Sequence, residues 1–382
     1  MRIPAQLWST KALYCCFSLS LAAQTVQELE TAARERLAVK DVNGALAAYG
    51  KLVQLVPKSP AYEDEIGFLL AATNRSGQAI PHFRRATELD PTFAQAWYHL
   101  GVALALVKQT NSAISALQRA VALAPGNTDY RDRLGLAWAT LGDSYQQEHR
   151  YKDARDAYWQ ALKLTPNNDL ARNSYGTALV RLGDPAAGLK EYHSILAHDP
   201  QNLQVQVNIG FAYIASGDFK SAIKHLSALT HDHPNDPGAH YDLGIAYKQT
   251  DDLPHAAAEL ERAIALDPSL AEAHYTLALI YIDAGNPVQA IGQLHAAVAQ
   301  RPDYNDAWYM LGTTLQQQGD AKGAIEALRK SVALDALNAG AWNNLGLLLR
   351  RDGDTAGSAQ AFAKAAEIRK AEEREKEKRL SK

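Results

Sequence analysis

The chain has 382 residues, of which 39 are basic and 42 are acidic, and its formal net charge is −3. This balance excludes a strong overall positive field, and with it nucleic acid or an anionic membrane as a partner attracted by net charge alone. A compact globule of this length would be expected to form about two or three domains, whereas a repeat array of any length is a single object.

The first residues have the layout of a secretory signal peptide. Basic residues precede an apolar run, Ala12–Ala23, which contains the small-x-small triplet Ser20-Leu21-Ala22. The run is shorter than the roughly 20 apolar residues that a stable membrane anchor needs. We therefore predict a signal peptide over residues 1–23, cleaved after Ala22 or Ala23, and an exported protein that is periplasmic, outer-membrane associated or extracellular. An uncleaved anchor and a helical N-terminal cap remain open as alternatives.

Both cysteines, Cys15 and Cys16, lie in this segment. If the segment is removed, the mature chain has no cysteine for a disulfide, a thiol nucleophile or a metal site. We expect such a protein to be held together by packing alone.

The clearest internal pattern is Ala94–Pro125, which reads as two amphipathic helices joined by a polar turn. Apolar or small residues recur at helical spacing, including Trp97, Leu100 and Leu104 in the first helix and Leu117 in the second. A helix pair of this size buries too little surface to fold alone, so the pattern predicts further copies on both sides.

The proline that closes this stretch recurs with a period of 34 residues. It stands at Pro57, Pro91, Pro125, Pro166, Pro200, Pro234, Pro268 and Pro302, with one longer step of 41 residues after Pro125. A Leu-Gly or Ile-Gly pair recurs in the first helix of most copies, and a small residue recurs in the second helix at Ala45, Ala79, Ala113, Ala154, Ala222, Ala256, Ala290 and Ala324. The chain thus resembles the tetratricopeptide repeat (TPR) family, whose 34-residue helix pair carries Trp, Leu-Gly, Tyr, Ala, Phe, Ala and Pro.

The resemblance implies an all-α fold, a right-handed α-solenoid (superhelix) of about ten helix-turn-helix TPR units. We expect the array over residues 24–370, with units ending near residues 57, 91, 125, 166, 200, 234, 268, 302, 336 and 370. The last residues, 371–382, are charged with interleaved signs and are expected to form a capping helix or tail.

Two repeats depart from the pattern. Between Pro125 and Pro166 the first helix carries seven extra residues, which is close to two helical turns, so we expect a longer helix that buries the same face and projects past its neighbours. Ala336 stands where a closing proline is expected, which predicts a less sharply set junction before the tenth repeat.

In the TPR family, positions two, five, nine, twelve and thirteen of the first helix usually line a concave groove. Carried over residue by residue, this implies nine candidates for a peptide groove: Tyr98, Asn173, Tyr241, Lys248, Tyr275, Tyr309, Asn343, Arg350 and Arg351. Asn344, next to Asn343, is added as a tenth candidate. Tyrosines offer flat apolar area with a hydroxyl at the edge, and an Asn and Arg pair can bind a peptide backbone and an acidic group. The alternative is that these residues are ordinary side chains of a helix surface with no role in binding.

We expect neither a metal nor a cofactor nor catalysis. His225, His231, His233 and His240 crowd one repeat junction but lack the paired spacing of a zinc site. The chain has no Gly-rich phosphate loop after a strand, no GxSxG and no HExxH motif, and repeats take up nearly all of it.

The sequence therefore predicts a non-catalytic scaffold for protein–protein interaction, which binds a protein or peptide segment in its concave groove in the cell envelope or outside. Nucleic acid is not expected as a partner, nor a membrane span after signal cleavage. One alternative is an accessory or assembly factor of a pilus, secretion or polysaccharide-export system. Another is a substrate-recruiting relative of TPR-containing glycosyltransferases.

Overall fold

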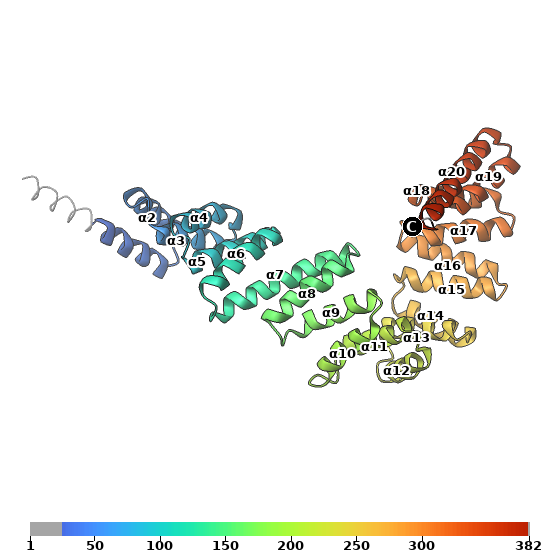
Figure 1. The fold of residues 1–382 in the computed structure, drawn as a ribbon, viewed down its shortest axis with the longest axis horizontal. Coiled ribbons are helices and arrows are strands. Elements are labelled where there is room, and N and C mark those ends of the chain that lie inside the picture. The colour runs from blue at the N-terminus through green and yellow to red at the C-terminus, as the bar shows by residue number, and fades with distance from the viewer. Residues whose placement is uncertain (1–24, 381–382) are drawn as a thin grey trace, which may run out of the picture. The chain divides into compact units, whose positions relative to one another are not determined.

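The computed structural model describes residues 25–380, and every regular element in this range is an α-helix. The expected all-α solenoid of repeated helix pairs is confirmed (Figure 1). The predicted signal peptide over residues 1–23 lies outside the described residues. The helices fall into two compact units, Met1–Glu191 and Tyr192–Lys382, whose boundary lies within α10.

Unit 1 begins with a helix over residues 25–38, which pairs with α2 in the first repeat. The first helices of the next four repeats are α3 (Pro60–Ala72), α5 (Ala94–Leu106), α7 (Thr128–Gln147) and α9 (Asp169–Arg181). The second helices are α2 (Val42–Leu55), α4 (Ser76–Leu89), α6 (Thr110–Leu123), α8 (Tyr151–Leu164) and α10 (Pro185–Leu196).

Unit 2 continues the alternation. Its first helices are α11 (Leu203–Ala215), α13 (Pro237–Gln249), α15 (Ala271–Asp283), α17 (Asn305–Gln317) and α19 (Ala339–Asp352). Its second helices are α12 (Phe219–Asp232), α14 (Leu253–Leu266), α16 (Pro287–Gln300), α18 (Ala321–Leu334) and α20 (Thr355–Leu380).

A left-handed residue joins the two helices of every repeat. Positive φ angles occur at Lys40, Asn74, Lys108, His149, Gly183, Gly217, Asp251, Gly285, Gly319 and Gly353. These residues follow the same 34-residue spacing as the prolines, with the same single step of 41. The turn geometry is therefore common to all repeats, although only five of them place glycine there.

The glycine at position eight of the first helix permits close packing within a pair. A Cβ atom on Gly142 would stand 2.6 Å from the ring of Tyr158, sixteen residues later, and one on Gly101 would stand 2.5 Å from Leu117. Such distances are far below van der Waals contact, so a side chain at this position would force the two helices apart.

The seven extra residues lengthen α7 to 20 residues, against 13 in α5 and α9. Gly142 makes the usual approach to α8, whereas Gly135, one heptad earlier, faces Thr165 beyond the end of α8. The added turns are thus at the start of α7, where Leu134 packs with α6 through Leu117. The longer helix does extend past α8, but its extra turns are packed against the preceding pair.

One expectation for the C-terminal repeats is wrong. The missing proline at Ala336 does not loosen its junction, because α18 ends two residues before it, as α16 ends two residues before Pro302. The charged residues expected to form a capping helix or tail are helical up to Leu380, as a continuation of α20. Neither proline nor glycine interrupts it where Lys370 takes the closing position, so its exposed charged residues extend the second helix of the tenth repeat.

We predict that Gly142→Ala lowers the free energy of unfolding by about 1–3 kcal/mol, because the new methyl group overlaps the buried Tyr158 ring. Urea denaturation followed by circular dichroism measures the loss. The matched control is Gly126→Ala, since no atom lies within 4 Å of the Cβ it would add. Equal stability of the two variants would contradict the packing role of Gly142.

Candidate functional site

Neighbouring first helices lie close together from α3 to α9 in unit 1 and from α11 to α15 in unit 2. α3 contacts α5, α5 contacts α7, and α7 contacts α9, as α11 contacts α13 and α13 contacts α15. Among the described helices, the second helices of neighbouring repeats make no contact of that extent. The surface formed by the first helices, here called the first-helix face, is therefore the inner side of the stack in each unit.

Three tyrosines gather on the first-helix face of unit 2, and we call them the tyrosine cluster: Tyr241 of α13, Tyr275 of α15 and Tyr304 at the start of α17. The ring centroids of Tyr275 and Tyr304 are 5.0 Å apart, and both rings pack partly buried against the core. Tyr241 is partly buried against the neighbouring core of α14 and α15. Because packing already restricts these rings, a ligand can bind against their flat apolar faces with little further loss of side-chain conformational entropy.

A charged pair borders the tyrosine cluster. The guanidinium of Arg301 lies 4.6 Å from the centroid of the Tyr304 ring and forms an ion pair with Glu272. Both charged side chains are partly exposed, so their pairing contributes little stability. Together they place a fixed cation and a fixed anion beside three aromatic rings.

The hydroxyl groups of the cluster are kept neutral. Burial raises the pKa of Tyr241 to about 12, and the carboxylates of Asp242 and Glu272 act in the same direction. Burial likewise raises the pKa of Tyr275 and of Tyr304. Near neutral pH these hydroxyls are therefore available as hydrogen-bond donors.

The structure distributes the ten residues expected from the sequence over several places. Tyr98 stacks on Tyr130, with ring centroids 4.6 Å apart, and Asn173 lines a hollow in the same unit 1. In unit 2, Tyr309 accepts a long hydrogen bond of 3.4 Å from Asn344. Only Tyr241 and Tyr275 of the ten belong to the tyrosine cluster.

The remaining candidates do not join it. Lys248 is half-buried in the last turn of α13, and Asn343 is half-buried on α19. Arg350 is exposed, with its guanidinium 5.7 Å from the Phe362 ring centroid, and Arg351 is exposed beside it. Arg350 and Arg351 on α19 thus place positive charge on the surface, but they do not form an enclosed site with Asn343.

Sequence reasoning missed Tyr304, Glu272 and Arg301. A signal for Tyr304 was present, because most first helices begin after a Ser, Asn or Asp whose side chain caps the helix. Tyr304, like Phe93 and Leu270, occupies this N-cap position without making a side-chain cap. An aromatic residue where a cap is expected indicates a role in packing or binding.

The crowded histidines have other partners. His225 contacts the backbone oxygen of Gln206 at 2.8 Å, and His240 lies between the carboxylate of Glu259 and the carbonyl of Pro234. His231 belongs to the last turn of α12 rather than to a turn between repeats. His225 and His240 are thus held by interactions that stabilise their repeats.

Family models of tetratricopeptide repeats match five stretches of the chain. One tetratricopeptide repeat model matches residues 66–128, 275–338 and 309–373, and a second matches residues 213–280. The model described as the cytochrome c-type biogenesis protein H TPR domain matches residues 133–239. None of the helices between residues 25 and 380 combines the length and apolar character that crossing a membrane requires.

Individual proteins show the same similarity over shorter lengths. Small glutamine-rich tetratricopeptide repeat-containing protein 2 of Mycosarcoma maydis is 28% identical over 118 residues, which cover 31% of this chain and 34% of that protein. The peroxisomal targeting signal receptor of Kluyveromyces lactis is 29% identical over 118 residues, covering 30% and 20%. The chain therefore spans about a third or less of these relatives. The solved structure of MamA residues 41-end from Desulfovibrio magneticus RS-1 is 25% identical, covers 45% of this chain and 97% of that chain, and has a TM-score of 0.41.

We predict that the Tyr241 hydroxyl titrates near pH 12. An unfolded tyrosine ionises near pH 10, so the stability contributed by the neutral buried hydroxyl is complete below pH 10 and is lost as the pH rises towards 12. NMR of the ring Cζ carbons in ¹³C-labelled tyrosine measures this titration, and the resonance missing from Tyr241→Phe identifies the residue. A midpoint near 10 would contradict its burial.

Proposed function

Since the chain belongs to the tetratricopeptide repeat proteins, a family that binds other proteins, we propose that it is a non-catalytic scaffold that holds a protein or peptide segment on its first-helix face. The principal binding site in this proposal is the tyrosine cluster of unit 2. The observation that carries it is the convergence of three half-buried tyrosines with the Glu272–Arg301 pair, in which Glu272 belongs to α15 and Arg301 ends α16.

The chemistry of the cluster favours a peptide. Half-buried rings can pack against the apolar side chains of a ligand, while neutral hydroxyls donate to its backbone carbonyls. Arg301 is partly held by Glu272 and by the Tyr304 ring, so little conformational entropy is lost when a ligand group binds beside it. Aromatic and arginine side chains are also the types most often found to dominate binding energy at protein interfaces.

An assembly role is the second candidate. The match of residues 133–239 to the TPR domain of a cytochrome c-type biogenesis protein supports the alternative of an accessory or assembly factor. Both candidates use the same first-helix face, so they differ in the partner and not in the mode of binding.

The test is the loss of partner capture when the cluster is removed. We expect Tyr275→Ala with Tyr304→Asn to weaken binding of the partner recovered by cross-linking from a cell-envelope fraction by at least about 10-fold, because buried aromatic contacts dominate such interfaces. Tyr304→Asn supplies the N-cap residue that other repeats have, which separates lost binding from lost folding. Isothermal titration calorimetry with the identified partner measures the change.

The matched control for this experiment is Tyr151→Ala, which removes a tyrosine from the second-helix side of unit 1. Its binding should equal that of the wild type. Unchanged affinity in the cluster variant, with its circular dichroism spectrum intact, would contradict the tyrosine site.

We also propose that the protein is exported, on the basis of the predicted signal peptide over residues 1–23. N-terminal sequencing of protein recovered from fractionated cells should find a chain beginning at Ala23 or Gln24 in the envelope or the medium. Leu21→Arg, which places a charge in the apolar run, should leave the chain unprocessed. An unprocessed wild-type N-terminus in the cytosolic fraction would refute export.

A further inference from the structure

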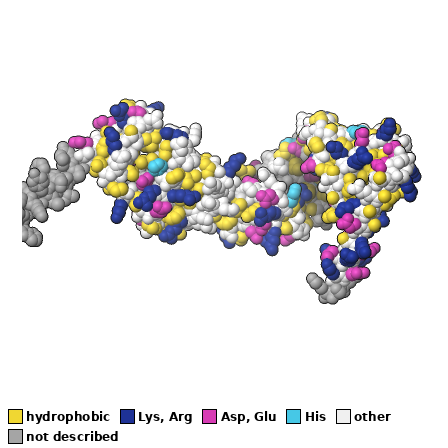
Figure 2. All heavy atoms as spheres, turned by 90° about the horizontal axis from the view of Figure 1, so that it is seen from above, with side chains coloured by type: hydrophobic (Ala, Val, Ile, Leu, Met, Phe, Trp, Pro, Cys, Tyr) yellow, Lys and Arg dark blue, Asp and Glu magenta, His cyan; other side chains and the backbone are white. Residues whose placement is uncertain are grey.

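The first helices of unit 2 carry an excess of negative charge around the tyrosine cluster. From α11 to α17 they hold four carboxylates and one amine, which are Asp242, Glu272, Asp283, Asp306 and Lys248. The second helices paired with them, α12 to α18, hold six Lys or Arg and four Asp or Glu residues. Both signs of charge also show on the side of unit 2 seen in the space-filling view (Figure 2). The negative excess thus belongs to the first helices and not to the surrounding surface.

One cation of the chain is already held beside the tyrosine cluster. The guanidinium of Arg301 lies over the Tyr304 ring and pairs with the carboxylate of Glu272. Glu272 is at position two of α15, and Arg301 is the residue that ends α16. A tyrosine ring and a position-two carboxylate therefore hold a guanidinium together in this chain.

The next repeat has the carboxylate but not the cation. Asp306 is at position two of α17, 34 residues after Glu272. The residue 34 positions after Arg301 is Asp335, which ends α18 and accepts a hydrogen bond of 2.9 Å from the backbone N–H of Leu337. Asp306 is exposed and forms no ion pair within the part of the chain that the structure describes. Its charge is thus left for a ligand to neutralise.

Asp306 belongs to the surroundings of the tyrosine cluster. It follows Tyr304 by two residues, and the ring centroid of Tyr304 is 5.0 Å from that of Tyr275. Burial raises the pKa of Tyr275, and the negative charge of Asp306 raises it further. The carboxylate is therefore close enough to act on Tyr275 electrostatically, so a cation packed on these rings would also be attracted by Asp306.

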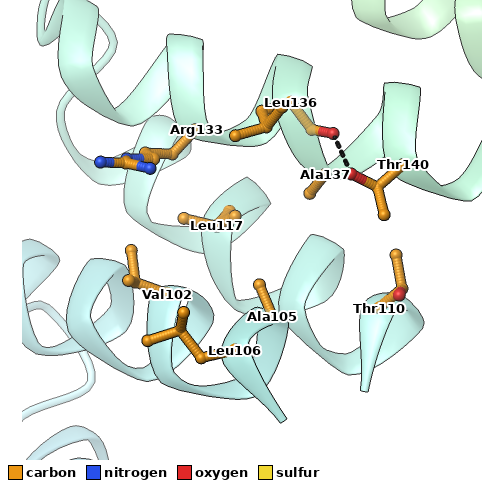
Figure 3. Close-up of a pocket in the computed structure, with 9 residues that line it drawn as sticks. All are labelled: Val102, Ala105, Leu106, Thr110, Leu117, Arg133, Leu136, Ala137 and Thr140. Atoms are coloured by element: carbon orange, nitrogen blue, oxygen red, sulfur yellow. Dashed lines mark hydrogen bonds between the residues drawn. The ribbon is translucent and has the colours of Figure 1, made fainter. Parts of the chain in front are cut away.

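The first-helix face of unit 1 offers a cation much less. Leu106 of α5 and Leu136 of α7 have exposed fractions of 65% and 52%, and both line a hollow of about 180 Å³ between these helices. In Figure 3, Arg133 stands at one end of the hollow and is the single charged residue among those that line it. No carboxylate lines this hollow, so a basic ligand is favoured on unit 2 rather than here.

We propose that the tyrosine cluster recognises an arginine-containing segment of a partner protein, whose guanidinium packs on the tyrosine rings and pairs with Asp306. Arginine suits this place better than lysine, because its planar guanidinium can stack on a ring while it donates hydrogen bonds to a carboxylate. The inference rests on the proposed function, since it names the ligand chemistry of the same site. The internal Arg301–Glu272 pair on the Tyr304 ring shows the same combination of groups.

The experiment uses a displayed library of random 12-residue peptides, selected in parallel on the full wild-type chain and on Asp306→Lys. Peptides enriched on the wild type alone should contain arginine. In fluorescence polarisation with such a peptide, Asp306→Asn should weaken binding about fivefold, the effect of one partly exposed ion pair. Replacing the arginine of the peptide by glutamine should weaken binding to the wild type but have little effect on binding to Asp306→Asn, because the two groups interact directly.

The matched control is Asp129→Asn, which removes an exposed carboxylate from position two of α7 in unit 1. Both substitutions take one favourable charge from the start of a first helix, so any loss of helix stability is common to them. Asp129→Asn should bind the selected peptide like the wild type.

Two outcomes would overturn the inference: enrichment of peptides without arginine, or arginine peptides whose affinity Asp306→Asn leaves unchanged. The variant Tyr275→Ala with Tyr304→Asn separates this failure from failure of the proposed function. If it weakens the selected peptides while Asp306→Asn does not, the tyrosine site stands and only the arginine ligand is wrong. If it binds them as the wild type does, the tyrosine site is wrong and the inference falls with it.

Discussion

The arrangement of the first helices depends on one hydrogen bond that recurs along the chain. The side chain at position four of a first helix donates from nitrogen to the backbone carbonyl six residues earlier, at the residue that closes the preceding repeat. The donors are Trp97, Arg172, Gln206, His240, His274, Trp308 and Trp342. In these seven repeats the bond ties the start of the first helix to the end of the repeat before it, and so helps to set the direction in which positions two to thirteen face.

The bond requires only a side-chain N–H group close to this carbonyl. Tryptophan, arginine, glutamine and histidine all supply one at position four. At the ninth repeat the closing residue is Ala336, yet Trp342 donates to its carbonyl at 3.0 Å. The junction thus depends on the carbonyl and on the helix end, and the proline ring is dispensable. In α3 the position-four residue is Glu63, whose carboxylate pairs with His82 and cannot donate, and in α7 the buried Nε of Arg131 has no hydrogen-bond partner among the described residues. Arg131 lies in the added turns that precede the normal contact with α8.

The period of 34 residues was sufficient to predict the helix pairs, because each pair repeats the same burial pattern. The site was less accessible to sequence reasoning. Position five includes Tyr241 and Tyr275, but the third ring, Tyr304, belongs to a different repeat position and joins the cluster through its contact with the Tyr275 ring. Tyr98 has the same repeat position as Tyr275 but stacks on Tyr130 instead. Repeat position predicts which face a residue is on, whereas its partner depends on the neighbouring repeat.

The turns between paired helices have the same backbone conformation in every repeat but carry different side chains. Each of the ten turns contains a residue in the left-handed conformation, which glycine adopts without strain. Lys108 adopts it with φ of 62°, at a cost of about 1–2 kcal/mol for a residue with a Cβ. It follows the exposed Leu106 by two residues, so the strained turn carries a cation beside the apolar face of unit 1. In unit 2, Gly319 occupies the corresponding turn and carries no charge. Because the backbone conformation is the same, the difference lies in the side chains, and the first-helix faces of the two units can recognise different ligand chemistry without any change of fold.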